Sequence, residues 1–163
     1  MSRSDAGFYW LPLSLLLALL LGLLPLPDAI APLRPYWLGI VLVYWLLETP
    51  DWAGMGIAFG IGLLGDLAFG TLIGEQALRL VVIAFIVQRF RARLRFFPLW
   101  QQSVAVFALL VNDRVIAAGV RMTMGEGLPR WPFWLAPLLA LALWPWLVLL
   151  LDTLRMRART RES

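Results

Sequence analysis

The sequence contains no cysteine and no histidine. Without cysteine there is no disulfide and no thiol chemistry, and without histidine the commonest metal ligand and general base are missing. The chain also has no G-x-S-x-G, H-E-x-x-H or P-loop motif. Its carboxylates are scattered singly, so no cluster of hard oxygen ligands is evident. We therefore predict a protein that is not an enzyme, with no catalytic residues, no metal and no cofactor.

Charge is scarce, whereas apolar residues are abundant. Only 15% of the residues are charged and 61% are hydrophobic, with a mean hydropathy of +0.81. Soluble domains are nearer half apolar, so this excess predicts a polytopic membrane protein. The net charge of +4 would suggest nucleic acid in a soluble protein. Here the arginines flank apolar runs, so we expect membrane lipids as partners and no nucleic acid.

Proline, glycine and charged residues divide the chain into six apolar segments. The predicted spans are 8–24, 36–47, 52–72, 76–88, 99–119 and 131–151. The second and fourth are short for a hydrocarbon core of about 30 Å, so we expect them to lean on their neighbours or to thin the bilayer. The predicted fold class is an all-α integral membrane protein with six transmembrane helices, in which 1–163 forms a single six-span membrane domain.

The arginines are distributed unevenly along these spans. Nine lie on one side of a six-span arrangement: Arg3, four between 89 and 95, and four between 155 and 161. Five lie on the other side or within spans: Arg34, Arg79, Arg114, Arg121 and Arg130. Bacterial inner-membrane proteins keep Lys and Arg in the cytoplasm. We therefore predict a multi-pass protein of the bacterial inner membrane with both termini cytoplasmic, a cytoplasmic basic loop at 89–98 and a cytoplasmic basic tail at 152–163.

Small residues recur at a spacing of four in two of the predicted spans. Such spacing lets helix backbones approach closely in lipid. One interpretation is packing between helices of this chain, and the other is a face that receives a partner's helix. Both stay open from the sequence. The predicted partner-binding residues are Ser14, Ala18 and Gly22 in the first span and Gly56 and Gly60 in the third.

Several polar residues fall inside the predicted spans, where charge is costly and usually has a partner. They are Asp66, Arg79, Asn112, Asp113 and Arg114. Counting residues from the span ends places them at similar depth, so we predict one intramembrane polar layer. Within it we expect Asp66 to pair with Arg79 or Arg114. A helix-capping role for Asp66 near Gly70, a proton relay, and a ligand or partner contact are the alternatives.

The order of motifs along the chain points to a known family. The motifs are Arg34-Pro35-Tyr36-Trp37, Tyr44-Trp45, Gly62-Leu63-Leu64-x-Asp66, Gly70-x-x-x-Gly74 and Phe97-Pro98-Leu99-Trp100-Gln101-Gln102. Each is modest by itself, but the ordered combination closely resembles MreD, a family of rod shape-determining inner-membrane proteins. The resemblance extends from about residue 12 to the sixth span.

This resemblance implies a function that composition does not show. Members of the family are non-enzymatic parts of the machinery that builds the lateral cell wall, and they associate with MreC. The assembly also includes MreB, RodA and a class B penicillin-binding transpeptidase. The family's fold is similar to the substrate-binding component of energy-coupling-factor transporters. We expect a scaffold that binds MreC and helps position peptidoglycan synthases; the alternative is a vitamin-type uptake transporter component with a pocket open to the periplasm.

Overall fold

The computed structural model describes residues 5–49 and 53–161 of the 163. In this part every regular element is a helix, which confirms the prediction of an all-α fold. The α-helices are α1 (Asp5–Leu23), α2 (Trp37–Glu48), α3 (Met55–Phe69), α4 (Glu75–Leu94), α5 (Leu99–Thr123) and α6 (Ala136–Arg161). Two short 3₁₀ helices, η1 (Ala31–Leu33) and η2 (Trp131–Leu135), precede α2 and α6.

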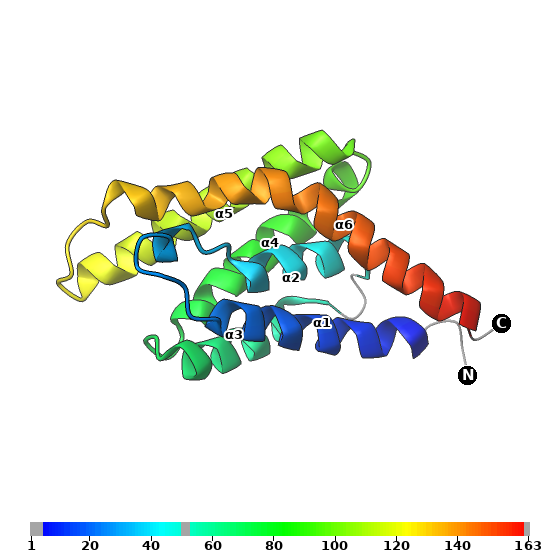
Figure 1. Cartoon of the computed structure of the whole chain (residues 1–163), viewed down its shortest axis with the longest axis horizontal. Coiled ribbons are helices and arrows are strands. Elements are labelled where there is room, and N and C mark those ends of the chain that lie inside the picture. The colour runs from blue at the N-terminus through cyan, green and yellow to red at the C-terminus, as the bar shows by residue number, and fades with distance from the viewer. Residues whose placement is uncertain (1–4, 50–52, 162–163) are drawn as a thin grey trace.

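The helices run up and down one elongated bundle, so their connections gather at two ends (Figure 1). One end holds the start of α1, the α4–α5 connection and the end of α6. We call it the basic end, because the arginines of 89–95 and 155–161 lie there. The other end holds the α1–α2, α3–α4 and α5–α6 connections, and we call it the turn end.

Helix α2 forms the centre of the bundle. Ten consecutive residues, from Leu38 to Leu47, are buried. A helix that is hydrophobic on all sides is expected to be buried on all sides, and α1, α4, α5 and α6 all contact α2. With 12 residues, α2 is only about 18 Å long. Its burial agrees with the expectation that this short segment leans on its neighbours.

The basic segments are more helical than the sequence suggested. Helix α4 continues to Leu94, so Arg89, Arg91 and Arg93 lie on its last turns and not in a loop. Helix α6 continues through most of the predicted tail, to Arg161. Arginine is a good helix former, and cations are favourable near a helix C-terminus. Both effects extend these helices beyond the apolar runs from which their ends were predicted.

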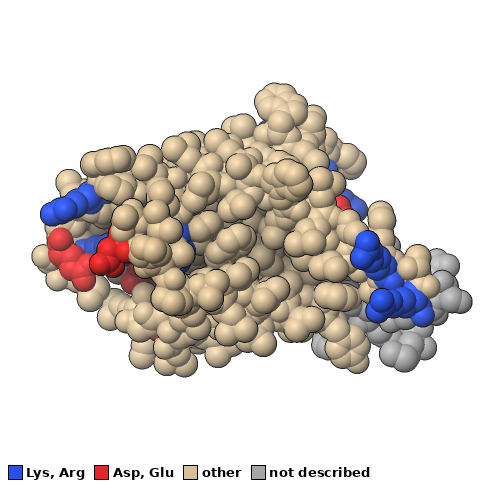
Figure 2. All heavy atoms as spheres, viewed as in Figure 1, with Lys and Arg blue, Asp and Glu red and all other residues tan. Residues whose placement is uncertain are grey.

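The outer surface of the bundle is largely apolar. Leu67, Phe85 and Trp146 are 72%, 59% and 75% exposed, and on the face drawn in Figure 2 the charged residues gather toward the two ends. Apolar surface of this extent marks contact with lipid or with other proteins. By length and composition, two helical stretches could cross a membrane, Leu99–Thr123 and Trp131–Ala158, and shorter apolar helices lie at Tyr9–Leu23, Trp37–Glu48 and Met55–Phe69.

Candidate functional site

The small-residue stripe of α1 is filled by the chain's own helices. Ala18 is only 1% exposed, and a Cβ atom on Gly22 would lie 2.7 Å from Cζ of Phe69 in α3. Ser14 Oγ accepts a hydrogen bond of 2.6 Å from Nε1 of Trp45 in α2. The prediction that Ser14, Ala18 and Gly22 receive a partner's helix is therefore corrected, because α2 and α3 already occupy this face. Packing within the chain is the interpretation that holds here.

In contrast to the α1 stripe, the pair Gly56 and Gly60 of α3 is exposed at the surface of the bundle. A Cβ atom on Gly56 or Gly60 would meet nothing within 4 Å. At about 100° per residue, Leu67 lies on the same side of α3 as this pair, with Phe59 and Leu64 flanking it. These three side chains are 72%, 52% and 53% exposed. We call this surface the glycine face (Gly56, Phe59, Gly60, Leu64 and Leu67); in the described part of the chain, no other helix covers its two glycines.

Close packing within the chain occurs on another side of α3. A Cβ atom on Gly62 would lie 2.6 Å from the backbone nitrogen of Ala77 in α4 and closer still to its Cα. Gly65 is buried on the same side, against Leu38 and Gln76. Internal packing of α3 thus depends on Gly62 and Gly65, and the glycine pair at the spacing of four does not take part in it.

Asp66 joins the end of α3 to the start of α4. Its Oδ1 accepts hydrogen bonds from Thr71 Oγ1 at 2.8 Å and from the Gln76 backbone nitrogen at 2.7 Å, and its Oδ2 accepts one from the Gly74 nitrogen at 2.7 Å. The turn is possible because Gly70 and Gly74 have φ values of +67° and +98°. The carboxylate therefore satisfies amide groups that the first turn of α4 would leave unpaired.

The predicted pairing of Asp66 with Arg79 or Arg114 is wrong, and the capping alternative is confirmed. Arg79 bonds Asp113 instead, with Nε at 2.7 Å from Oδ1 and Nη2 at 2.6 Å from Oδ2. Its Nη1 also lies 3.6 Å from Glu75. The physical reason is that the oxygens of Asp66 already accept three hydrogen bonds from the α3–α4 turn.

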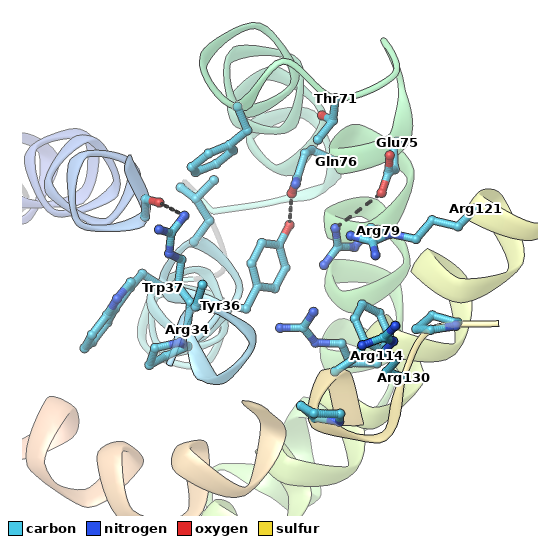
Figure 3. Close-up of a pocket in the computed structure, with 18 of the residues that line it drawn as sticks. Arg34, Tyr36, Trp37, Thr71, Glu75, Gln76, Arg79, Arg114, Arg121 and Arg130 are labelled. Atoms are coloured by element: carbon cyan, nitrogen blue, oxygen red, sulfur yellow. Dashed lines mark hydrogen bonds and ion pairs between the residues drawn. The ribbon is translucent and has the colours of Figure 1, made fainter. Parts of the chain in front are cut away.

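The Arg79–Asp113 pair is buried and joins α4 to α5. The two residues are 6% and 1% exposed, and the two parallel bonds have the strong fork geometry of an arginine and a carboxylate. The guanidinium of Arg79 lies 4.6 Å from the ring centroid of Tyr36. Tyr36 in turn donates a hydrogen bond of 2.5 Å to Gln76 Oε1 (Figure 3). The start of α2 and the helices α4 and α5 are thereby held together at the turn end.

The other residues of the predicted polar layer make no hydrogen bond or ion pair with Arg79 or Asp113 in the described part of the chain. Asn112 is half-buried. Arg114 lies with its Cζ 4.6 Å from the ring centroid of Phe133 in η2. Asp66 belongs to the separate α3–α4 turn. In the described residues there is no group of three or more acidic side chains that could hold a metal ion.

A cavity of about 700 Å³ opens at the turn end, next to the Arg79–Asp113 pair (Figure 3). Its walls come from α1 to α5, from η1 and η2, and from the loops that join these elements at the turn end. Its charged lining residues are Asp28, Arg34, Glu75, Arg79, Arg114, Arg121 and Arg130, and its aromatic ones are Tyr36, Trp37, Phe69 and Phe133. Sequence reasoning predicted a pocket only for the transporter alternative and did not assign its walls, because they come from distant segments.

Sequence reasoning also missed a polar cluster at the basic end. Tyr44 in α2 donates a hydrogen bond of 2.6 Å to Asp152 in α6. Arg155 donates to the hydroxyl of Tyr44 and to Glu48, each at 3.1 Å. This arginine was interpreted only as a topology signal, but it ties α6 to the end of α2. The available signal was a tyrosine inside an apolar run, with an acid and an arginine following the last span.

Comparisons with known proteins agree with the resemblance seen in the motifs. Residues 3–154 match the model of a family described as rod shape-determining protein MreD. The rod shape-determining protein MreD of Haemophilus influenzae is 32% identical over 143 residues, which cover 88% of this chain and 88% of that protein. No solved structure matches the chain.

Proposed function

Because this chain belongs to the MreD family of rod shape-determining proteins, we propose that it is a membrane scaffold of the cell-wall elongation complex. In this proposal it binds MreC and helps position the peptidoglycan synthases. MreB, RodA and a class B penicillin-binding transpeptidase are the further members of the assembly. The observation that carries the proposal is the uncovered glycine face of α3.

The proposed topology is six spans in the bacterial inner membrane, with the basic end in the cytoplasm. Two features support it: six α-helices alternate in direction, and nine of the fourteen arginines lie toward one side. Reporter fusions after Arg95 and after Ser163 should both be cytoplasmic, and a fusion near Gly125 should be periplasmic. A cytoplasmic signal at Gly125 would overturn the six-span arrangement.

The glycine face suits the membrane helix of a partner. Lipid tails are as apolar as leucine, so helices associate in a membrane through close packing and a few polar contacts. Gly56 and Gly60 offer backbone without side chains, and Phe59 and Leu64 stand on either side of them. Such a surface accepts one helix that packs closely along α3. MreC is the expected occupant, because the family resemblance implies a partner with a single membrane span.

The test adds bulk to the glycine face without disturbing the bundle. In the double variant Gly56→Leu/Gly60→Leu we expect normal insertion and an unchanged thermal unfolding midpoint, but loss of co-purification with MreC and loss of rod shape. Gly119→Leu is the matched control, because Gly119 is also an exposed glycine of a helix with nothing within 4 Å of an added Cβ. Normal co-purification of the double variant with MreC would exclude this face.

A second candidate function is a small-molecule uptake component of the vitamin-transporter type. The cavity of about 700 Å³ favours it, because its volume is in the range of pockets that hold small organic ligands. The sequence resemblance implies a fold similar to the substrate-binding component of energy-coupling-factor transporters, and such a fold would suit this role. Mass spectrometry of the protein purified in mild detergent would show a retained small molecule. Capture of MreC would support the scaffold instead, because the uptake function does not predict it.

A further inference from the structure

Among the described residues, all five arginines outside the basic end line the same cavity. Arg34 follows η1, Arg79 belongs to α4, Arg114 and Arg121 belong to α5, and Arg130 precedes η2. They are separated by up to 96 positions in the sequence, counted from Arg34 to Arg130. In the proposed topology this is the periplasmic end, where arginine is uncommon. A role for these arginines within the cavity would explain why they gather at an end of the protein where arginine is uncommon.

Most of this positive charge is not neutralised by the protein itself. Arg79 is paired with Asp113. In the part of the chain that the structure describes, the guanidinium groups of Arg114, Arg121 and Arg130 make no hydrogen bond or ion pair. The Cζ atoms of Arg114 and Arg121 lie 4.6 Å and 5.1 Å from the centroid of the Phe133 ring. Two cations that share one aromatic ring attract the ring but repel each other, so an anion between them would be stabilising.

A fourth guanidinium has an unused donor at the cavity wall. Arg34 donates from Nη1 to the carbonyl of Gly22 at 2.8 Å and from Nη2 to the carbonyl of Leu24 at 2.7 Å. These two bonds satisfy the end of α1. The Nε atom of Arg34 is buried and has no partner among the described residues. A buried donor without a partner is rare in proteins, because its desolvation is uncompensated.

We propose that this cavity binds a phosphate-bearing organic ligand. Guanidinium groups bind phosphate through parallel hydrogen bonds, and phosphate carries up to about two negative charges, against one for a carboxylate. Against the five arginines of the lining stand its two acids, Asp28 and Glu75, and Asp113, the partner of Arg79. Five positive charges against three negative ones leave an excess of two, so a multiply charged anion balances the site better. Tyr36, Trp37, Phe69 and Phe133 supply apolar walls for the rest of the ligand.

The cavity is larger than a bare inorganic anion requires. About 700 Å³ corresponds to pockets that enclose an organic molecule. The phosphate could be carried by a soluble compound or by the headgroup of an anionic phospholipid, and the chemistry at the arginines is the same for both. The site does not rest on the proposed scaffold function, because none of its residues lies on the glycine face.

The first experiment uses phenyl phosphate as the probe, with phenol as the uncharged control, on detergent-purified protein. We expect saturable binding of phenyl phosphate by calorimetry and no comparable binding of phenol. The double variant Arg114→Gln/Arg121→Gln should bind phenyl phosphate at least about tenfold more weakly, because each charge-assisted bond contributes that much or more. Arg93→Gln, an exposed arginine at the basic end, should bind normally.

The second experiment identifies the source of the phosphate. Native mass spectrometry would compare retention of phosphatidylglycerol and phosphatidylcholine by the same variants. A lipid headgroup is identified if the protein selectively retains phosphatidylglycerol, if this lipid displaces phenyl phosphate, and if the double variant loses the retention. A soluble ligand is identified if phenyl phosphate binds and phosphatidylglycerol does not displace it.

If the Arg114/Arg121 variant fails to fold, Arg121→Gln/Arg130→Gln replaces it, since both residues are exposed. Binding of neither probe, or binding that is equal in these variants and the natural chain, would overturn the proposal.

Discussion

Two stripes of small residues with the same spacing have opposite roles in this molecule. Ser14, Ala18 and Gly22 on α1 face inward, and Trp45 and Phe69 pack over them. Gly56 and Gly60 on α3 face outward, and their surface is open. The comparison shows that a spacing of four indicates where another helix can approach closely. It does not indicate whether a helix of the same chain already occupies that position.

The difference between a covered and an open glycine can be tested within α3 alone, by adding one methyl group at each of two glycines in separate variants. Gly62→Ala places a Cβ within 2.6 Å of the Ala77 backbone, so α3 and α4 must separate. We expect destabilisation by about 3 kcal/mol, at the upper end of ordinary overpacking because the clash is with backbone. Gly60→Ala is the matched control and should be neutral or stabilising by up to about 1 kcal/mol, because alanine favours helix.

Thermal unfolding in detergent, followed by circular dichroism, measures both variants. The expected result is a clearly lower midpoint for Gly62→Ala and an unchanged or higher one for Gly60→Ala. Equal midpoints would contradict the assignment of inner and outer faces of α3. A normal midpoint for Gly62→Ala together with a lowered one for Gly60→Ala would reverse it.

A smaller effect is expected from the polar residue of the buried stripe. Ser14→Ala removes the acceptor of the Trp45 indole N–H, and Trp45 is 0% exposed. An unpaired buried donor costs about 1–3 kcal/mol, so the unfolding midpoint should fall. The near-ultraviolet circular dichroism of the tryptophans should change as well, because the indole loses its fixed partner.

Ser103→Ala is the control for that substitution. Ser14 is half-buried and Ser103 is buried. The hydroxyl of Ser103 donates only to the backbone carbonyl of Leu99 at 3.0 Å. Removing this hydroxyl leaves no side-chain donor unpaired, so we expect a smaller loss of stability than for Ser14→Ala. If the two serine variants were equally stable, the Trp45 contact would contribute nothing specific to the packing of α1 on α2.

The candidate site shows which parts of such a protein can be predicted. The sequence identified Asp66, Arg79 and Asp113 as buried charges that need partners, and each has them. It assigned the wrong partner to Asp66, because counting residues gives the depth of a side chain along a helix but not which neighbouring element that side of the helix meets. The α3–α4 turn, with Gly70 and Gly74 at positive φ, brings amide groups to Asp66 before any guanidinium can reach it.

The sequence by itself determined that the chain is helical, which segments are apolar, where the arginines lie along them, and to which family it belongs. Only the tertiary structure decided which face of each helix is inside. In a soluble helix the polar side reveals the surface. In this protein the inner and outer faces are both apolar, as Leu38 in the core and Leu67 at 72% exposure show. Periodicity therefore carries no signal for orientation, and the cavity, the α1 stripe and the glycine face become distinguishable only once the helices are packed.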